Sequence, residues 1–315
     1  MPSEQLKALI ALRWATKPTS KKSIEALRGK RSDGGFEPRD GTKVASADAD
    51  GVYGEWVVYG TPGSESIFLF LHGGGFCRSS GPASRRIASN LSAACGCRCF
   101  TVDYRLAPEH TFPAAIDDTF TAYQWLLKQG IPPKRIVGGG SSAGGGLTAS
   151  LLTKLKQTGL SQPAAAVFIS PWTDLTQSAS TYRTNADADC SISKNHLDRM
   201  AKQYLDGADP KHPLASPVFT DLSGLPPMLV QVGKLETMYG DAEAYASKAR
   251  RAGVPVEFEA YDHVPHAWHN SDHLVPGIPE VHAAINRIGE FFKAHGGKSA
   301  QGRELGVRNG GRERD

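Results

Sequence analysis

Residues 136–157 read IVGGGSSAGGGLTASLLTKLKQ, which is an apolar run, a glycine- and serine-rich turn and an amphipathic segment in succession. The apolar run ending at Gly138 predicts a buried strand, and the apolar spacing from Ala143 onward predicts a helix. The turn contains Gly-x-Ser-x-Gly, a pattern typical of a nucleophilic serine held between a strand and a helix. A phosphate-binding turn is the other interpretation, but the Lys-Ser/Thr pair of that motif is absent.

The spacing of the glycines selects one of the two adjacent serines. Gly140 and Gly144 stand two residues before and two residues after Ser142, whereas the frame of Ser141 would put Ala143 where a glycine is needed. Such a turn holds its serine in a strained backbone conformation with the hydroxyl exposed, and the glycines let the strand and the helix approach closely. We therefore predict that Ser142 is a nucleophile.

A second glycine run, His72–Phe76, directly follows the apolar segment Ile67–Leu71. Amide groups in a glycine run can turn toward one point, which is what a developing oxyanion requires. The N–H group of the residue after the nucleophile would complete the set. We therefore predict an oxyanion hole made by the backbone of Gly73, Gly74, Gly75 and Ala143.

Short apolar strands alternate with helical patterns along most of the chain, and this alternation predicts an α/β fold with a mostly parallel, doubly wound sheet. Parallel strands are covered on both faces, so they read as continuous apolar runs, as these do. The predicted strands are Glu55–Tyr59, Ile67–Leu71, Arg98–Val102, Arg135–Gly138, Ala164–Ser170, Met228–Val232 and Val256–Tyr261. The predicted helices are Ala114–Gln129, Ala143–Gln157, Ala242–Ala252 and Pro279–Lys293.

Between Asp174 and Pro227 the chain shows no strand signal, although residues 194–204 have a helical pattern. A structureless loop of that length is uncommon inside a compact domain, so we predict an inserted helical cap. Residues 1–31 read as one or two amphipathic helices that pack with this cap, and residues 32–54 read as a Gly/Asp-rich loop. The predicted division is N-terminal cap helices and loop 1–50, core 51–173 and 226–296, cap 174–225 and a disordered tail 297–315.

The net charge of +4 comes from the two ends of the chain. Residues 1–31 hold eight basic against two acidic residues, and residues 297–315 hold five against three, so the remainder is slightly acidic. A nucleic-acid binder would carry its basic surface across the core, so we expect no nucleic-acid partner. No apolar run approaches the roughly 20 residues that a membrane span needs, and we see no convincing cleavable signal, so we expect no membrane association.

The five cysteines are too few for a disulfide scaffold, and their number is odd. Cys95, Cys97 and Cys99 alternate along a predicted strand, but three thiols on one face cannot surround a tetrahedral ion without a fourth ligand. We interpret them as small hydrophobic side chains and expect no metal. Reduced thiols and the lack of a signal segment predict a cytoplasmic protein.

A nucleophilic serine needs a base that takes its proton. In sites built on this motif the acid and then the histidine follow the serine along the chain. Position after the last predicted strand leaves four histidines open: His263, His266, His269 and His273. Position after the strand Met228–Val232 leaves two acids open: Glu236 and Asp241.

Four stretches together resemble the hormone-sensitive-lipase-like carboxylesterases, the bacterial family IV esterases. They are His72–Phe76, Asp103–His110 with Phe112–Ala114, Gly140–Gly145 and Ser170–Leu175. Leu225–Pro227 matches as well, and the resemblance spans about residues 55–292. It implies an α/β-hydrolase fold with a helical cap, hydrolysis of short- to medium-chain carboxylic esters through an acyl-serine, no cofactor and a tendency to form homodimers.

Carried over residue by residue, the resemblance implies Ser142 as the nucleophile, His266 as the base and Glu236 as the acid. Asp241 lies at the start of a predicted helix, where we expect it to cap free N–H groups. We also predict a bounded substrate pocket lined by four aromatic residues: Phe76, Trp172, Tyr204 and Trp268.

Two alternatives to a carboxylesterase are open. A lactone hydrolase would use the same residues and differ only in its pocket. A ligand receptor of the same fold would have lost the base, and the joint presence of Ser142, Glu236 and His266 argues against it. An assay with a chromogenic short-chain ester separates an enzyme from a receptor.

Overall fold

The computed structural model describes residues 1–17, 37–79 and 81–296. Its centre is an eight-stranded sheet with the strand order β1-β2-β4-β3-β5-β6-β7-β8. The pairs β1–β2 and β2–β4 are antiparallel, and every other neighbouring pair is parallel. The strands are β1 Thr42–Ala49, β2 Val52–Tyr59, β3 Ile67–Leu71, β4 Arg98–Val102, β5 Ile136–Ser141, β6 Ala165–Ile169, β7 Met228–Gly233 and β8 Val256–Tyr261.

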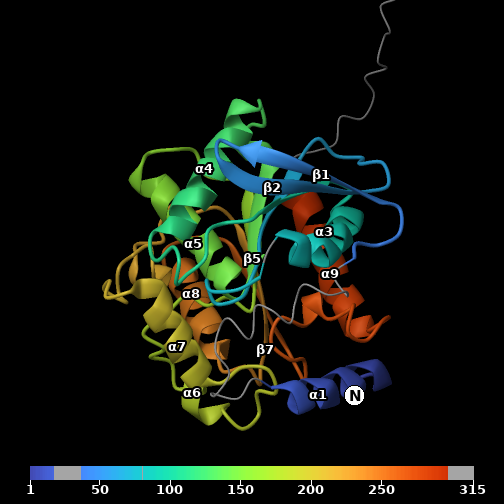
Figure 1. The fold of residues 1–315 in the computed structure, drawn as a ribbon, viewed down its shortest axis with the longest axis vertical. Helices are drawn as coiled ribbons and strands as arrows, with labels where there is room; N and C mark the ends of the chain where they lie inside the picture. Colours follow the sequence, from blue (N-terminus) through green and yellow to red (C-terminus); the bar gives the residue numbers. More distant parts are fainter. Residues whose placement is uncertain (18–36, 80, 297–315) are drawn as a thin grey trace, which may run out of the picture.

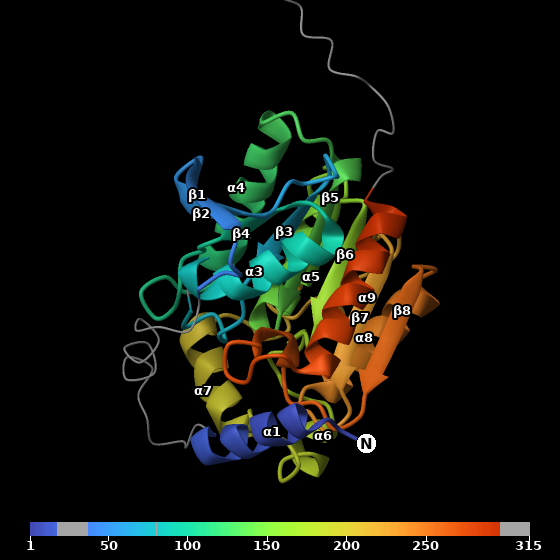
Figure 2. The same cartoon turned by 90° about the vertical axis from the view of Figure 1, so that its right-hand side faces the viewer.

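Helices cover both faces of this sheet, as Figures 1 and 2 show. The helices with described residues are α1 Glu4–Thr16, α3 Gly81–Cys95, α4 Ala114–Lys128, α5 Ala143–Gln157, α6 Thr181–Thr184, α7 Lys194–Leu205, α8 Tyr239–Arg251 and α9 Pro279–His295, with 3-10 turns η1 Pro133–Arg135, η2 Pro217–Phe219 and η3 Trp268–Asn270. Successive side chains of β3 point to opposite faces. Phe68 and Phe70 pack with α3 and α9, whereas Leu69 and Leu71 pack with α4 and α5. The predicted doubly wound, mostly parallel sheet is confirmed.

The prediction of a loop over residues 32–54 is wrong, because its second half forms β1 and the start of β2. β1 lies at the edge of the sheet and is largely exposed. In its sequence, TKVASADA, only the small side chains of Ala47 and Ala49 pack against the core, so no run of large apolar residues marks the strand. The turn between the two strands is made by Asp50 (φ 56°) and Gly51 (φ 92°). Asp-Gly is a preferred pair for a tight hairpin turn, and this signal marks the hairpin in the sequence.

Helix α3 was not expected from the sequence either. Its segment begins Gly-Pro and is rich in serine and arginine, which hides its apolar stripe. Ile87 and Leu91 form that apolar stripe, and they pack against the sheet and against α9. The cysteines at its end and in β4 are buried in the same cluster and are free thiols, as their interpretation as small hydrophobic residues requires.

Helices α1, α6 and α7 lie together at the end of the sheet where β8 points in Figure 2. The predicted helical pattern at 194–204 corresponds to α7, and that near the N-terminus to α1. The second predicted N-terminal helix, around Ile24 and Leu27, and the predicted tail lie outside the described residues. None of the helices in the described ranges is both long and apolar enough to cross a membrane.

Candidate active site

The turn between β5 and α5 holds Ser142 at the carboxyl end of a central strand. β5 ends at Ser141 and α5 begins at Ala143, so Ser142 alone makes the reversal, with φ at 56° and ψ at −121°. This left-handed φ is uncommon for a residue with a side chain and marks local strain. Two hydrogen bonds fix the turn: Ser142 N–H donates to the Ile169 carbonyl at 2.9 Å, and Trp172 N–H donates to the Ser142 carbonyl at 3.0 Å.

The two motif glycines are required by the same turn. A Cβ on Gly140 would overlap the carbonyl of Gly144, and a Cβ on Gly144 would overlap the carbonyls of Leu71 and His72. Backbone atoms cannot move aside as a flexible side chain can. The predicted frame around Ser142 therefore follows from backbone packing as well as from the spacing of the glycines.

The glycine loop after β3 lies beside this serine. A Cβ on Gly73 would stand 3.2 Å from the Cβ of Ser142. Gly74 (φ 121°) and Gly75 (φ 64°) then turn the chain through conformations that favour glycine. The loop backbone thus lies against the serine turn. Ala143 is the first residue of α5, directly after Ser142.

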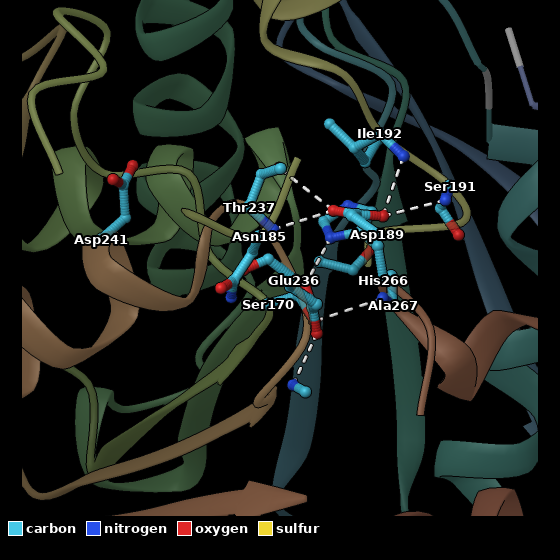
Figure 3. Close-up of polar contacts among 12 residues, drawn as sticks. Ser170, Asn185, Asp189, Ser191, Ile192, Glu236, Thr237, Asp241, His266 and Ala267 are labelled. Carbon is cyan, nitrogen blue, oxygen red and sulfur yellow. Dashed lines mark hydrogen bonds and ion pairs between the residues drawn. The ribbon is translucent and has the colours of Figure 1, made fainter. Parts of the chain in front are cut away.

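Glu236 and His266 are joined by a hydrogen bond of 2.7 Å between Oε2 and Nδ1 (Figure 3). The other carboxylate oxygen, Oε1, accepts the hydroxyl of Ser170 at 2.7 Å and the N–H of Gly233 at 2.6 Å. Glu236 is 1% exposed and His266 is 7% exposed. A buried carboxylate with all these partners is held in one orientation.

Ser170 links the acid to the histidine loop. Its hydroxyl donates to Glu236 and accepts the N–H of Ala267 at 3.1 Å, as Figure 3 shows. Both Ser170 (φ 45°) and Ala267 (φ 48°) adopt left-handed backbone conformations. Ser170 lies in one of the family-like stretches, but no role for it could be predicted from the sequence, because its two partners lie 66 and 97 residues away.

The other histidines that the sequence left open occupy different environments. His263 is exposed, and His273 lies on the cavity wall described below. His269 is buried, and its Nε2 lies 2.7 Å from Oε1 of Gln231. Burial lowers the pKa of His269 to about 3, so this ring is neutral.

Asp241 lies apart from the Glu236–His266 pair in Figure 3. Its Oδ2 accepts the N–H of Asp174 at 3.1 Å and the hydroxyl of Tyr182 at 2.9 Å. The expectation that it caps a helix is wrong, because α8 begins after Met238 and has no side-chain cap. Burial, with the nearby carboxylate of Asp174, raises the pKa of Asp241 well above its usual value.

A cavity of about 640 Å³ opens at this end of the sheet. Ser142, His266 and the loop glycines Gly73, Gly74 and Gly75 all lie on its wall, so the structure brings these predicted residues together. Further wall residues come from α1, α3, α7 and the segment around Ser191 and Ile192. The cavity is therefore bounded by elements far apart in the sequence.

The chain is similar to known proteins over most of its length. A family model described as the alpha/beta hydrolase fold matches residues 68–270. An acetyl-hydrolase of Streptomyces hygroscopicus is 38% identical over 299 residues, which cover 94% of this chain and 97% of that protein. An esterase of Acinetobacter venetianus is 38% identical over 242 residues, which cover 76% and 78%.

Solved structures agree with these relatives. The crystal structure of an esterase from the bacterial hormone-sensitive lipase family superposes with a TM-score of 0.87 at 39% identity and covers 94% of this chain and 100% of that one. The esterase EstE5, soaked with p-nitrophenyl butyrate, gives a TM-score of 0.88 at 36% identity, with coverages of 93% and 98%.

The chain is a hormone-sensitive-lipase-like carboxylesterase. It belongs to the alpha/beta hydrolase fold family, as the resemblance in the sequence implied, and it is a carboxylic ester hydrolase.

The structure brings none of the four predicted substrate-contacting aromatic residues of this carboxylesterase to the described cavity wall. Phe76 and Tyr204 stack on each other, with ring centroids 4.0 Å apart, and Trp172 packs beside Phe76. Trp268 is fully buried in the cluster under α9. These large rings fill the protein core behind the site, since burying aromatic surface is strongly favourable.

Asp189 is a residue of the carboxylesterase that sequence reasoning missed. Its Oδ1 accepts the N–H groups of Ser191 and Ile192, and its Oδ2 accepts the N–H and hydroxyl of Thr237 (Figure 3). Ser191 and Ile192 lie on the cavity wall, and Thr237 follows Glu236. One carboxylate thus ties a wall segment to the loop of the acid, and no local sequence pattern marks it.

Proposed function

We propose that this carboxylesterase hydrolyses short- to medium-chain esters with Ser142 as nucleophile, His266 as base and Glu236 as the acid that orients it. The observation that carries the proposal is the 2.7 Å contact between Glu236 Oε2 and His266 Nδ1, with Ser142 and His266 on the wall of the same cavity. The relatives named esterase and acetyl-hydrolase support the same reaction class.

Proton transfer follows from this arrangement. Oε2 of Glu236 accepts a hydrogen bond from the Nδ1–H of His266, which keeps the ring proton on Nδ1. Nε2 of His266 is therefore free to accept the Ser142 proton. The serine oxygen attacks the ester carbonyl carbon, and the carbonyl electron pair moves onto oxygen. Collapse of this tetrahedral intermediate breaks the bond to the alcohol, which leaves with the proton that His266 carries.

The acyl-serine is then hydrolysed by the same groups. Water gives a proton to His266 as its oxygen attacks the acyl carbon, and that proton returns to the Ser142 oxygen as the acid product leaves. In both halves the oxyanion is held by backbone N–H groups of Gly73, Gly74, Gly75 and Ala143. The glycine loop beside the serine supports this role, and one such donor contributes about 2.7–4 kcal/mol of barrier lowering in another serine hydrolase.

A series of p-nitrophenyl esters tests the proposal. We expect kcat/KM to be highest between the acetate and the octanoate, because the cavity is bounded by α1 and α7, and to be low for the palmitate. Ser142→Ala should reduce kcat by at least about 10³-fold without unfolding the protein. Ser141→Ala is the matched control: it loses one hydrogen bond from Asn270 and should keep most activity. A maximum at the palmitate, or an inactive Ser141→Ala with an active Ser142→Ala, contradicts the proposal.

We further propose a cytoplasmic location and, because the resembled esterase family tends to form homodimers, a homodimer. All five cysteines are free and buried, which suits a reducing compartment. Cell fractionation and light scattering of the purified protein measure the two properties directly.

A further inference from the structure

His196 is a buried polar side chain on the cavity wall. It lies on α7, is 2% exposed and contributes to the lining of the cavity that holds Ser142 and His266. Neither ring nitrogen has a hydrogen-bond partner in the part of the chain that the structure describes. Because burying a polar group without a partner is costly, this ring is suited to bind something that enters the cavity.

The surroundings of His196 are positively charged. Burial, with the charges of Arg78 and Arg199, lowers its pKa to about 4, so the ring is neutral near pH 7. A neutral imidazole carries one N–H donor. The ring can therefore donate one hydrogen bond into a region where the nearby charges favour an anion.

The charged side chains on the rest of the cavity wall are also positive. Arg13, Lys17, Arg78 and Arg86 all line the cavity, and none of its described lining residues is an aspartate or glutamate. Arg86 is paired with Asp272 at 2.8 Å, and Lys17 donates to the carbonyl of Asp189. Clefts lined by one sign of charge attract ligands of the opposite sign.

We propose that the natural substrate carries a carboxylate besides its ester group, and that His196 and Arg78 bind this carboxylate while Ser142 attacks the ester. The proposal rests on the proposed function and names its substrate class: a monoester of a dicarboxylic acid, or an ester of a hydroxy acid. A carboxylate accepts hydrogen bonds only, so it matches the N–H of His196 and the guanidinium of Arg78. The carboxylate is not altered in the reaction.

Monomethyl glutarate and dimethyl glutarate form a matched substrate pair for the test. They share the acyl chain and the leaving group and differ only in the second carboxyl, which is charged in the first and neutral in the second. We expect kcat/KM per ester group to be about tenfold higher for the monoester, which corresponds to about 1.4 kcal/mol. Because salt screens charges, the preference should shrink between low and high NaCl.

Variants then assign the preference to residues. His196→Leu and Arg78→Gln should each reduce the monoester-to-diester ratio toward one, and Arg78→Lys should keep most of it. Arg251→Gln removes an equal charge from an exposed position at the end of α8 and should leave the ratio unchanged. Thermal unfolding of each variant shows whether it is folded.

The outcomes separate this inference from the proposed function. If the wild-type enzyme has the same kcat/KM per ester group for dimethyl glutarate and monomethyl glutarate, the inference is overturned and the esterase mechanism is unaffected. A preference that survives both His196→Leu and Arg78→Gln also overturns it. If the enzyme hydrolyses neither p-nitrophenyl butyrate nor either glutarate ester, both the proposed function and this inference are contradicted.

Discussion

At the scale of single residues, Glu236 divides its two oxygens between two tasks. Oε1 accepts the N–H of Gly233 and the hydroxyl of Ser170, and Oε2 faces Nδ1 of His266. Among the side-chain groups of this length, only a carboxylate has two oxygens that both accept hydrogen bonds. The charge of this residue therefore determines which nitrogen of the histidine carries the proton.

Glu236→Gln is predicted to fold and to lose about 10⁴-fold in kcat, the size of the effect when a triad acid becomes an amide elsewhere. The amide oxygen would take the place of Oε1, which turns the amide NH₂ toward Nδ1 and forces the ring proton onto Nε2. Steady-state kinetics with p-nitrophenyl butyrate and thermal unfolding measure both effects. Asp241→Asn is the matched control and should keep most activity; the reverse pattern would make Asp241 the acid.

The buried carboxyl of Asp241 predicts a pH effect on stability. Its raised pKa means that the folded protein keeps this proton at pH values where the unfolded chain, with a pKa of about 3.9, has lost it. Folded stability therefore falls as pH rises through this window. Asp241→Asn lacks the titration, so the Tm of the variant minus that of wild type should increase from pH 4.5 to pH 7. A difference that is constant or decreasing contradicts the raised pKa.

Motif spacing predicted Ser142 directly, whereas chain order left four histidines and two acids open and the family resemblance selected His266 and Glu236. The structure brings these two into contact. The bridging hydroxyl of Ser170 and the carboxylate of Asp189 could not be predicted, because their partners are distant in the sequence. Aromatic residues near motifs were poor guides to the cavity wall. They pack in the interior because of their size, and nothing in their spacing distinguishes the core from the cavity.

At the scale of helices and strands, the buried strands were easier to predict from the sequence than the exposed one. The central parallel strands are buried on both faces, so their sequences are apolar throughout and mark them clearly. β1 is an exposed edge strand, and it is held in the sheet by its backbone pairing with β2, which its own sequence pattern does not indicate. In α3 the guanidinium of Arg85 satisfies the buried carboxylate of Glu55 at 2.6 Å, a long-range pairing that makes a charged helix face compatible with burial.

The close approach of α5 to β3 predicts the effect of a single methyl group. Gly144→Ala would drive a Cβ into the carbonyl oxygens of Leu71 and His72, so we expect a loss of at least about 2 kcal/mol in the free energy of unfolding, together with most activity. Gly63→Ala makes the same chemical change at an exposed site with open space and should change stability by less than about 1 kcal/mol. Urea unfolding compares the two variants. Equal stabilities would mean that the turn between β5 and α5 has room for a side chain at residue 144.

At the scale of the whole molecule, the N-terminal helix is part of the folded unit and of the site. The Ser3 N–H and hydroxyl donate to the two carboxylate oxygens of Glu280, at the start of α9, at 2.8 and 2.7 Å. Leu6 and Leu9 are buried in the cluster beneath α9. The far end of the same helix brings Arg13 to the cavity wall. Anchoring of this helix in the apolar cluster therefore positions a charge in the site.

Two leucines on α1 test this anchoring. Leu9 is 0% exposed and Leu12 is 37% exposed, so the same substitution removes packing at one position and little at the other. Leu9→Ala should lower the free energy of unfolding by about 2 kcal/mol or more, whereas Leu12→Ala should stay within about 0.5 kcal/mol of wild type. Because a loosened α1 no longer fixes Arg13, KM for monomethyl glutarate should rise in Leu9→Ala and not in Leu12→Ala. If the two variants unfold at the same urea concentration with equal KM values, α1 is not held by its apolar face and the cavity wall does not depend on it.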